Sequence, residues 1–176
     1  MSTMSEKIIS NLEKLGCKAK IVSISHINEM RDELFALRDC NLIDKKLYED
    51  TISWMSFDPD IALKNAKSII VIAAPQMITK ANFKYKNNTY SLTIPPTYVT
   101  NDISNKVKEL MDEIVSEYGV SFQKASLPRK QIAVKSGLAK YGKNNITYIN
   151  GWEAFTHLCA TIQIWMFLLI VGNQEK

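Results

Sequence analysis

Apolar positions recur at helical spacing in several segments of the chain. Residues 5–15 carry apolar side chains every three or four positions, and Gly16 follows them as a stop signal. The same period predicts further helices over residues 28–39, 44–53, 60–66, 102–118 and 128–136. Gly119 and Gly137 come directly after the last two, where a residue in the left-handed conformation commonly ends a helix. We expect the apolar stripes of these helices to pack into the core.

The predicted strands follow two other patterns. Residues 68–74 form an unbroken, β-branched apolar run that ends at Pro75, which is typical of a strand buried on both faces. Alternation of apolar and polar residues predicts strands over 20–25, 120–125 and 145–150, and a hairpin over 83–94 that turns at Asn87-Asn88. The pattern as a whole predicts the α/β class, with α+β as the open alternative. The expected architecture is a central mixed sheet flanked by helices in a single domain.

Length and composition narrow the class of protein. A chain of 176 residues suits one domain that needs neither a disulfide nor a metal to close its core. With 46% hydrophobic and 23% charged residues, it is not a disordered, collagenous or disulfide-scaffold protein. A net charge of +4 is too small to indicate nucleic-acid binding. The densest basic stretch, residues 124–143, is either a solvated helix face or a surface for an anionic ligand.

The cysteines and histidines do not form a ligand pattern. Cys17, Cys40 and Cys159 are odd in number and far apart, so we expect free thiols in a reducing cytoplasm. His26 and His157 add no metal-binding spacing, so no metal site is predicted. The polar amino terminus lacks the apolar core of a signal peptide, which favours a cytoplasmic protein with no membrane partner.

One segment carries a chemical signal. Residues 137–144 read GLAKYGKN, which matches the phosphate loop G-x-x-x-x-G-K-[ST] except at its last position, where Asn144 lacks the required hydroxyl. The segment also follows a predicted helix and precedes a predicted strand, the reverse of a phosphate loop. We therefore expect a tight turn whose glycines let the backbone approach a ligand closely. A plain structural turn with Lys143 solvated is the alternative.

The longer stretch RKQIAVKSGLAKYGKNNITY, residues 129–148, resembles the AGLGWIGKN segment of epoxyqueuosine reductases. The upstream stretch DPDIALKNAKSIIVIA, residues 58–73, is similar to the helix and AKSVIV strand at the start of that family. Order and spacing are kept from about residue 57 to residue 151. Members of the family are cobalamin-dependent iron–sulfur reductases, so the resemblance implies an oxidoreductase-like protein.

The resemblance also implies a cofactor site. In the family the glycine-rich segment lies against the corrinoid, which makes Gly137, Gly142, Lys143 and Asn144 the candidate cobalamin contacts. Glycines admit a large flat ring, and lysine or asparagine can donate to its amide and phosphate periphery. An electron donor is a further partner that the resemblance implies.

Two departures from the family concern catalysis. Its proton-donating aspartate falls near Gln123 in this chain, and an amide cannot act as a general acid. No C-x₂-C-x₂-C-x₃-C run is present to hold the 4Fe-4S clusters of full-length relatives, and Cys159 stands alone. No catalytic residue is therefore assigned, and the substrate stays open.

The apolar run 164–171 is too short to cross a bilayer, which takes about 20 residues. It predicts a buried terminal strand or helix, a membrane segment beginning near Phe155, or the product of a frameshift or truncation that removed the iron–sulfur half. We favour the last, with residues 1–160 as the domain and 161–176 as an apolar tail. The expected function is the amino-terminal domain of such a reductase, not competent alone. The alternatives are a non-catalytic interaction domain and an inactive fragment.

Overall fold

A central antiparallel sheet organises the chain. The computed structural model describes residues 4–55, 57, 63–64, 66–75, 79–94, 102–125, 127–149, 152 and the backbone of 160–168. The sheet contains β1 (Lys18–Ser23), β2 (Ser68–Pro75), β8 (Ala160–Leu168) and β5 (Ser121–Lys124), in the order β1-β2-β8-β5. All three described pairings are antiparallel. The α/β class in a single domain is confirmed, but the described sheet has no parallel pair of the kind that a mixed sheet would contain.

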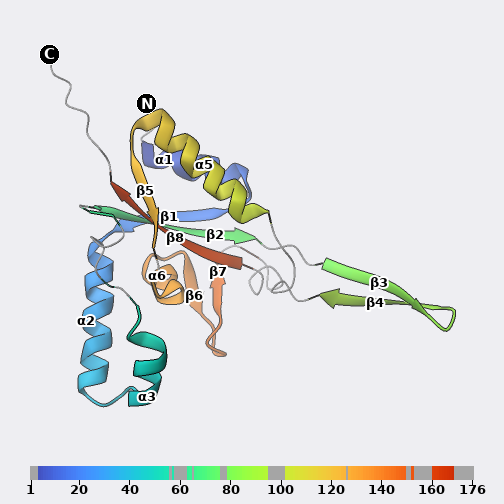
Figure 1. The fold of residues 1–176 in the computed structure, drawn as a ribbon, viewed down its shortest axis with the longest axis horizontal. Helices are drawn as coiled ribbons and strands as arrows, with labels where there is room; N and C mark the ends of the chain where they lie inside the picture. The colour runs from blue at the N-terminus through green and yellow to red at the C-terminus, as the bar shows by residue number, and fades with distance from the viewer. Residues whose placement is uncertain are drawn as a thin grey trace.

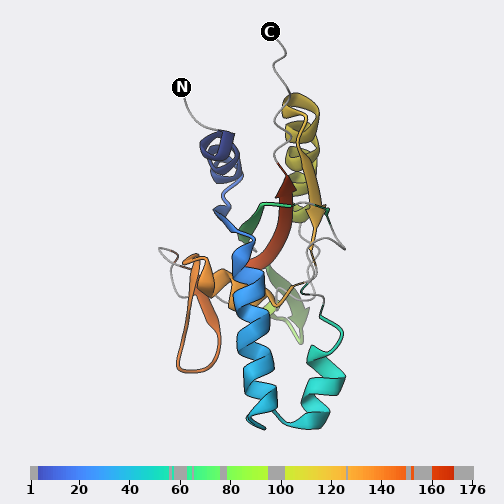
Figure 2. The same cartoon turned by 90° about the vertical axis from the view of Figure 1, so that its left-hand side faces the viewer.

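Helices cover both faces of this sheet, as Figures 1 and 2 show. On one side lie α1 (Met4–Lys14) and α5 (Ile103–Tyr118), and on the other lie α2 (Ser25–Asp39) and α6 (Arg129–Lys135). The ion pair between Lys135 Nζ and Glu33 Oε1, 2.6 Å long, links α6 to α2.

The two cores meet at β2. Its residues Ile69, Val71 and Ala73 pack into the cluster with α2 and α6. The alternate residues Ile70, Ile72 and Ala74 pack into the cluster with α1 and α5. Successive side chains of a strand point to opposite faces, so one strand serves both clusters. This burial on two sides explains the unbroken apolar run and confirms the prediction for residues 68–74.

Two hairpins stand outside the main sheet. One pairs β3 (Thr79–Tyr85) with β4 (Asn88–Ile94), and the other pairs β6 (Ala139–Tyr141) with β7 (Thr147–Ile149). The predicted hairpin is confirmed, but it begins at Thr79 rather than at residue 83, and it turns one residue earlier, at Lys86-Asn87, where φ is 47° and 65°. Positive φ at both central residues is the mark of the type I′ turn that suits the twist of a hairpin.

Other boundaries differ modestly from the expected ones. Helix α2 begins at Ser25 rather than after Asn28; its N-cap residue Ile24 offers no capping side chain, but the Ser25 N–H donates to Ser23 Oγ at 3.2 Å. The helix predicted over 44–53 is a single turn of α3 (Lys45–Leu47) followed by the π-helix η1 (Tyr48–Ile52). Asp44 caps it, since its Oδ1 accepts a 2.8 Å hydrogen bond from the Leu47 N–H. The helix predicted over 60–66 falls largely outside the described residues.

The apolar carboxyl-terminal run contributes an interior strand. The backbone of β8 pairs with β2 over eight residues and with β5 over four. The boundary predicted at residue 160 therefore falls on the first residue of β8. In the described part of the chain, no helix has the length and apolar character needed to span a bilayer. The origin of this segment in a frameshift or truncation stays a prediction.

Replacing Ile70 by alanine tests the double-sided core. The Ile70 side chain is wholly buried, so we expect a loss of about 2–5 kcal/mol in the free energy of unfolding. Leu42→Ala is the control, because Leu42 is 72% exposed and its truncation should change stability by less than about 0.5 kcal/mol. Urea titrations of both variants make the comparison. Equal midpoints for Ile70→Ala and the parent chain would contradict the assignment of β2 as the shared core strand.

Candidate functional site

Gly137 ends helix α6 in a left-handed conformation. Its φ is +72°, its N–H donates to the Val134 carbonyl at 3.0 Å, and the Leu138 N–H donates to the Ala133 carbonyl at 3.0 Å. This pair of bonds is the Schellman arrangement that commonly closes a helix at glycine. The predicted stop at Gly137 is therefore confirmed. A Cβ built on Gly137 meets nothing within 4 Å, so its outer side faces open space.

Gly142 occupies a different turn. Its N–H donates to the Ile146 carbonyl at 2.8 Å, and its carbonyl accepts from the Asn145 N–H at 3.0 Å, which closes the connection from β6 to β7. A Cβ at this position would lie 2.3 Å from Cε2 of Tyr148, far inside van der Waals contact. Packing of the Tyr148 ring against the bare backbone therefore explains why this position is glycine.

The expected single turn over residues 137–144 is wrong in shape. Strand β6 separates Gly137 from Gly142, and five residue steps of extended chain span roughly 16 Å. One glycine ends a helix and the other sits at the tip of a hairpin. The sequence spacing of a phosphate loop is thus present without its geometry.

The two polar residues of the segment lie at the hairpin tip. Asn144 is held inside it: Nδ2 donates to the Tyr148 hydroxyl at 3.1 Å, and Oδ1 accepts from the Ile146 N–H at 3.2 Å. The Lys143 side chain is exposed. Of the four predicted contacts, Gly142 and Asn144 are thus engaged with Tyr148, whereas Gly137 and Lys143 face outward.

A groove of about 670 Å³ runs beside Gly137. The groove lies between the end of α1, strand β1, the turn after α6 and Trp152. Its volume suits a small-molecule ligand. Its described lining residues are Ile9, Glu13, Gly16, Cys17, Lys18, Ala19, Lys20, Gly137, Leu138 and Trp152. Gly142, Lys143 and Asn144 are not among these lining residues. The structure thus brings Gly137 to a hollow and leaves the other three predicted residues at the hairpin tip.

The groove offers an aromatic surface and cationic side chains. Nζ of Lys18 lies 5.6 Å from the centre of the Trp152 ring, a cation–π contact. Lys20 is exposed on the same strand, and Glu13 is the one carboxylate of the described lining. The sequence did not single out Lys18, Lys20 or Trp152, because Trp152 is far from the two lysines in the chain and shares no motif with them.

Cys17 at the groove is a neutral thiol. Only 2% of the residue is exposed, and burial raises the pKa of its thiol from an ordinary value of 9.0 to about 11. Thiolate is the form that attacks electrophiles and binds metals. At neutral pH Cys17 therefore belongs to the core rather than to a reaction. Cys40 is exposed, and Cys159 lies outside the described residues.

Gln123 stands far from this groove. It lies on β5, the last strand of the described sheet, whereas the groove follows β1, the first. Three strand spacings, roughly 14 Å, separate the two. The Gln123 side chain is exposed. Gln123, near which the resemblance led us to expect the family's proton donor, therefore does not line the groove.

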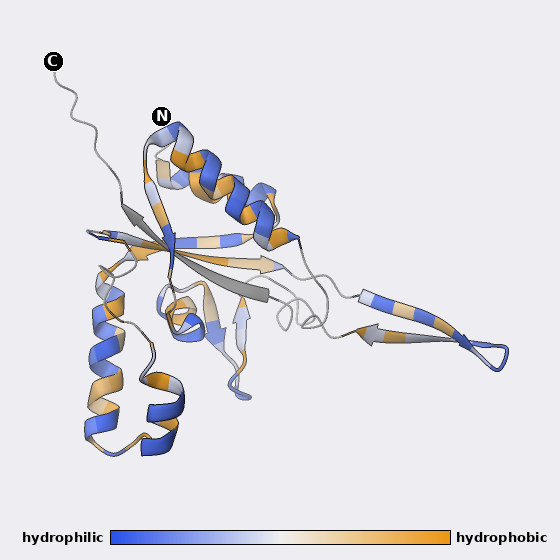
Figure 3. Ribbon diagram, in the orientation of Figure 1, coloured by the Kyte–Doolittle hydropathy of each residue, from blue (hydrophilic) through white to orange (hydrophobic). Residues whose placement is uncertain are grey.

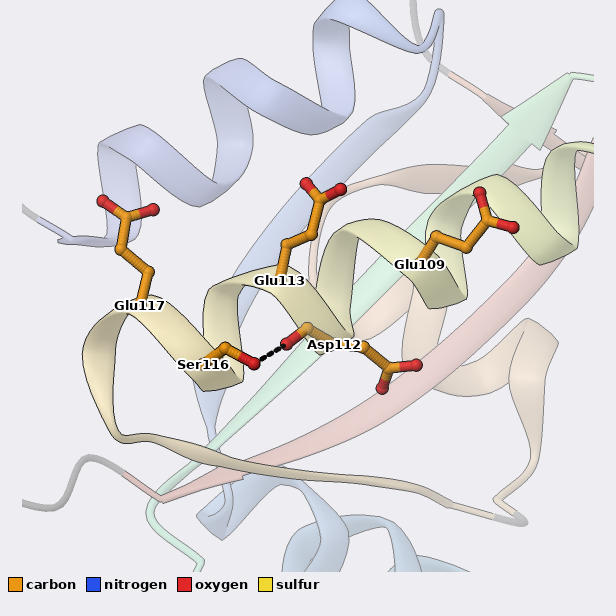
Figure 4. Close-up of a pocket in the computed structure, with 5 residues that line it drawn as sticks. All are labelled: Glu109, Asp112, Glu113, Ser116 and Glu117. Carbon is orange, nitrogen blue, oxygen red and sulfur yellow. Dashed lines mark hydrogen bonds between the residues drawn. The ribbon is translucent and has the colours of Figure 1, made fainter.

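A second hollow, of about 630 Å³, lies along the exposed face of α5 (Figure 4). Its described lining residues are Glu109, Asp112, Glu113, Ser116 and Glu117. The Ser116 hydroxyl donates to the Asp112 carbonyl oxygen at 3.1 Å, so it is engaged with its own helix. Acidic residues three and four apart are visible in the sequence as one helix face, but they were not predicted as a site. Among the described residues, no group of three or more His, Cys, Asp or Glu is arranged to hold a metal ion.

Solved structures with the same fold exist. The chain is similar in fold to epoxyqueuosine reductases. The enzyme from Streptococcus thermophilus matches with a TM-score of 0.65 and 17% identity, over 99% of this chain and 49% of that one. An epoxyqueuosine reductase from Bacillus subtilis, solved with its catalytic aspartate loop swung out of the active site, matches with a TM-score of 0.62 and 14% identity, over 94% and 45%.

A selenomethionine-labelled epoxyqueuosine reductase gives a TM-score of 0.60 and 13% identity, over 94% of this chain and 46% of that one. The chain thus spans about half the length of the solved structures that it matches. No protein-family model matches, and neither does any curated protein sequence. The predicted resemblance is confirmed, and at this identity what the likeness shows is the fold.

Replacing Gly142 by alanine tests its role in the hairpin. The added methyl group collides with the Tyr148 ring, so we expect a loss of about 1–3 kcal/mol of stability, the usual cost of overpacking. In the double variant Gly142→Ala/Tyr148→Ala the collision with the ring is absent and the contact with Asn144 Oδ1, 2.8 Å from the built Cβ, remains, so the alanine at 142 should cost less than it does beside tyrosine. Thermal unfolding of the four chains of this cycle gives the comparison. Equal costs in both backgrounds would show that Tyr148 is not the reason for glycine.

The two described cysteines should differ in reactivity. At pH 8 we expect iodoacetamide to label Cys40 within minutes and to leave Cys17 unlabelled, because Cys17 is buried and protonated. The folded thiol has the higher pKa, so the stability it contributes is complete below about pH 9 and declines as the pH rises towards 11. Peptide mapping by mass spectrometry identifies the labelled sites. Rapid labelling of Cys17 in the folded protein would contradict its burial.

Proposed function

We propose that this chain is the corrinoid-facing, amino-terminal domain of a reductase similar to epoxyqueuosine reductase. The observation that carries the proposal is the match to that fold over 94–99% of the chain, at TM-scores of 0.60–0.65. The glycine-bearing segment supports it, because one of its predicted contacts, Gly137, lies in the wall of a ligand-sized groove. The rest of a redox enzyme would have to supply electrons, so this domain is not competent alone.

The groove residues fit a corrinoid. A side chain at Gly137 would project into open space beside the groove. Because glycine has no side chain, that space is left open for a flat ring. The Trp152 indole offers a flat apolar surface, and Lys18 and Lys20 are cations of the kind that can donate to amide and phosphate groups on the periphery of the ring. When bound, cobalamin would supply a redox-active metal that no amino-acid side chain provides.

The four predicted contacts do not contribute equally to this proposal. Gly137 is retained as a contact in the groove, and Lys143 at the hairpin tip is retained as a proposed contact outside the groove lining. Gly142 and Asn144 fit less well, because Tyr148 packs on one and hydrogen-bonds with the other. They hold the hairpin that presents Lys143, and so act as positioning residues.

No protonation step is assigned to this chain. The resemblance places the family's acid near Gln123, and an amide cannot act as a general acid. We therefore do not propose epoxyqueuosine as the substrate. The described residues also provide no ligand set for a 4Fe-4S cluster, and no step is routed through one.

Binding of hydroxocobalamin to the purified 176-residue chain tests the proposal. We expect a shift of the visible absorption bands that saturates with protein concentration. Gly137→Asn should weaken binding at least about tenfold, since asparagine tolerates the left-handed backbone but places its side chain in the open space beside the groove, where the proposed ring would lie. Gly119→Asn is the matched control: Gly119 also follows a helix, its φ is +62°, and a Cβ built there meets nothing within 4 Å.

Three results would count against this function. Unchanged cobalamin spectra at roughly 100-fold excess protein would remove the corrinoid role. Equal loss of binding in Gly137→Asn and Gly119→Asn would trace the effect to general destabilisation. Unchanged binding of cobalamin by Gly137→Asn would show that the ligand does not occupy this groove. The interaction-domain alternative would then be preferred.

A further inference from the structure

The β3–β4 hairpin extends away from the rest of the domain. Figure 1 shows it as an arm beyond the sheet and its covering helices. Most of its side chains are exposed, including Phe83, Tyr85, Tyr90 and Leu92 at 45%, 57%, 43% and 57%. An isolated two-stranded hairpin is marginally stable in water, because it has no sheet face or helix to pack against. An arm with this composition therefore gains from a surface that covers it.

Strand register sorts the side chains of the arm onto two faces. Ala81 pairs with Leu92 and Phe83 pairs with Tyr90, so these four share one face. The rings of Phe83 and Tyr90 stack with their centres 5.5 Å apart and their planes at 22°. Tyr85 continues the same side of its strand. We call these five residues the apolar arm face; along β3 the bands of Figure 3 alternate between hydrophilic and hydrophobic.

The opposite side of the arm is polar and cationic. Lys80 pairs with Thr93, Asn82 with Ser91 and Lys84 with Thr89, and together they form the basic arm face. Neither strand carries a carboxylate. Lys86 stands in the turn, with its Nζ 5.3 Å from the centre of the Tyr85 ring.

This separation bears on the kind of partner. A nucleic-acid site needs cations for the phosphates beside the aromatic rings on which the bases stack. A site for an anionic lipid surface likewise needs cations for the headgroups beside the apolar side chains that contact the acyl chains. Here the lysines of the two strands lie on the reverse face, and only Lys86 at the tip lies near a ring. The apolar arm face itself is uncharged, so it matches another uncharged apolar surface.

We propose that the apolar arm face pairs with the same face of a second copy of this chain. In a contact with two-fold symmetry, the apolar arm faces of the two copies would stack on each other, and both basic arm faces would stay in water. Paired sheets pack about 10 Å apart, so the two lysine layers would lie further from each other than the Debye length of about 8 Å at physiological salt. Self-pairing therefore keeps the lysines of the two strands out of the contact, and Lys86, whose Nζ lies 5.3 Å from the centre of the Tyr85 ring, stands at the tip of the arm, at the edge of the contact.

The area predicts a weak, reversible dimer. Aromatic side chains offer about 150–250 Å² each, so the exposed fractions of Phe83, Tyr85, Tyr90 and Leu92 amount to roughly 400 Å² per copy. Two copies would bury roughly 800 Å², below the roughly 1,200–2,000 Å² of stable interfaces and in the range of transient ones. Association in the micromolar range or weaker is expected.

Sedimentation velocity of the 176-residue chain, from about 1 to about 500 μM, tests the proposal. We expect the mass to rise from 20.0 kDa towards twice that value as concentration increases. Leu92→Lys should weaken association at least about tenfold, equivalent to about 1.4 kcal/mol, because it would place a charge in the contact. Ser91→Lys is the matched control, since it adds the same charge one residue away on the basic arm face.

Leu92→Thr is a second variant, which keeps the β propensity of the position and removes apolar area. It tests the contact even where the lysine variant fails to fold. It should also weaken association while the far-ultraviolet circular dichroism stays unchanged. A chain that remains at 20.0 kDa up to about 500 μM would overturn the proposal. So would equal effects of Leu92→Lys and Ser91→Lys. Tight binding to phosphatidylserine vesicles or to single-stranded RNA that is lost in Lys84→Glu, without self-association, would overturn it too and assign the arm to a polyanion.

Discussion

The fold depends on the burial of β2 on both of its faces. Six consecutive residues of this strand, 69–74, have no solvent exposure, and alternate members feed two separate helix-covered clusters. At about 25 cal/mol per Å² of apolar surface, such a strand contributes more to stability than any surface contact in the molecule. Strand β1 and helices α1 and α5 complete one cluster, and α2 and α6 complete the other. The groove beside Gly137 forms where elements of both clusters meet β1.

The glycine-bearing segment shows how one motif can serve two structural purposes. Gly137 closes a helix with a left-handed residue and leaves its outer side open, whereas Gly142 makes room for the Tyr148 ring. Strand β6 keeps them apart. A corrinoid role for this region therefore depends on the groove at Gly137 and on Lys143 at the hairpin tip. It does not depend on a phosphate-loop-like cradle.

The surface of the domain divides into regions of distinct chemistry. The groove combines an indole with two lysines, the exposed face of α5 is acidic, and the β3–β4 arm separates an apolar face from a basic one. The basic stretch 124–143 is not a single patch, because Lys135 is paired with Glu33 while Lys143 stands at the β6–β7 tip. The fold shared with epoxyqueuosine reductases extends over about half the length of those structures.

Local patterns were enough to predict much of this protein. Residues 68–74 could be assigned as a doubly buried strand, 102–118 as an amphipathic helix and 83–94 as a hairpin, because the period of apolar residues depends on nearest neighbours along the chain. The stop at Gly137 followed from the same local chemistry. The tertiary structure alone decided the strand order, the antiparallel pairing and the place of β8 between β2 and β5. It also decided that Lys18, Trp152 and Gly137 meet at one groove while Gln123 lies at the other edge. Strand β1 and the residues after α6 are far apart in the chain, and no local pattern encodes which distant surfaces pack together.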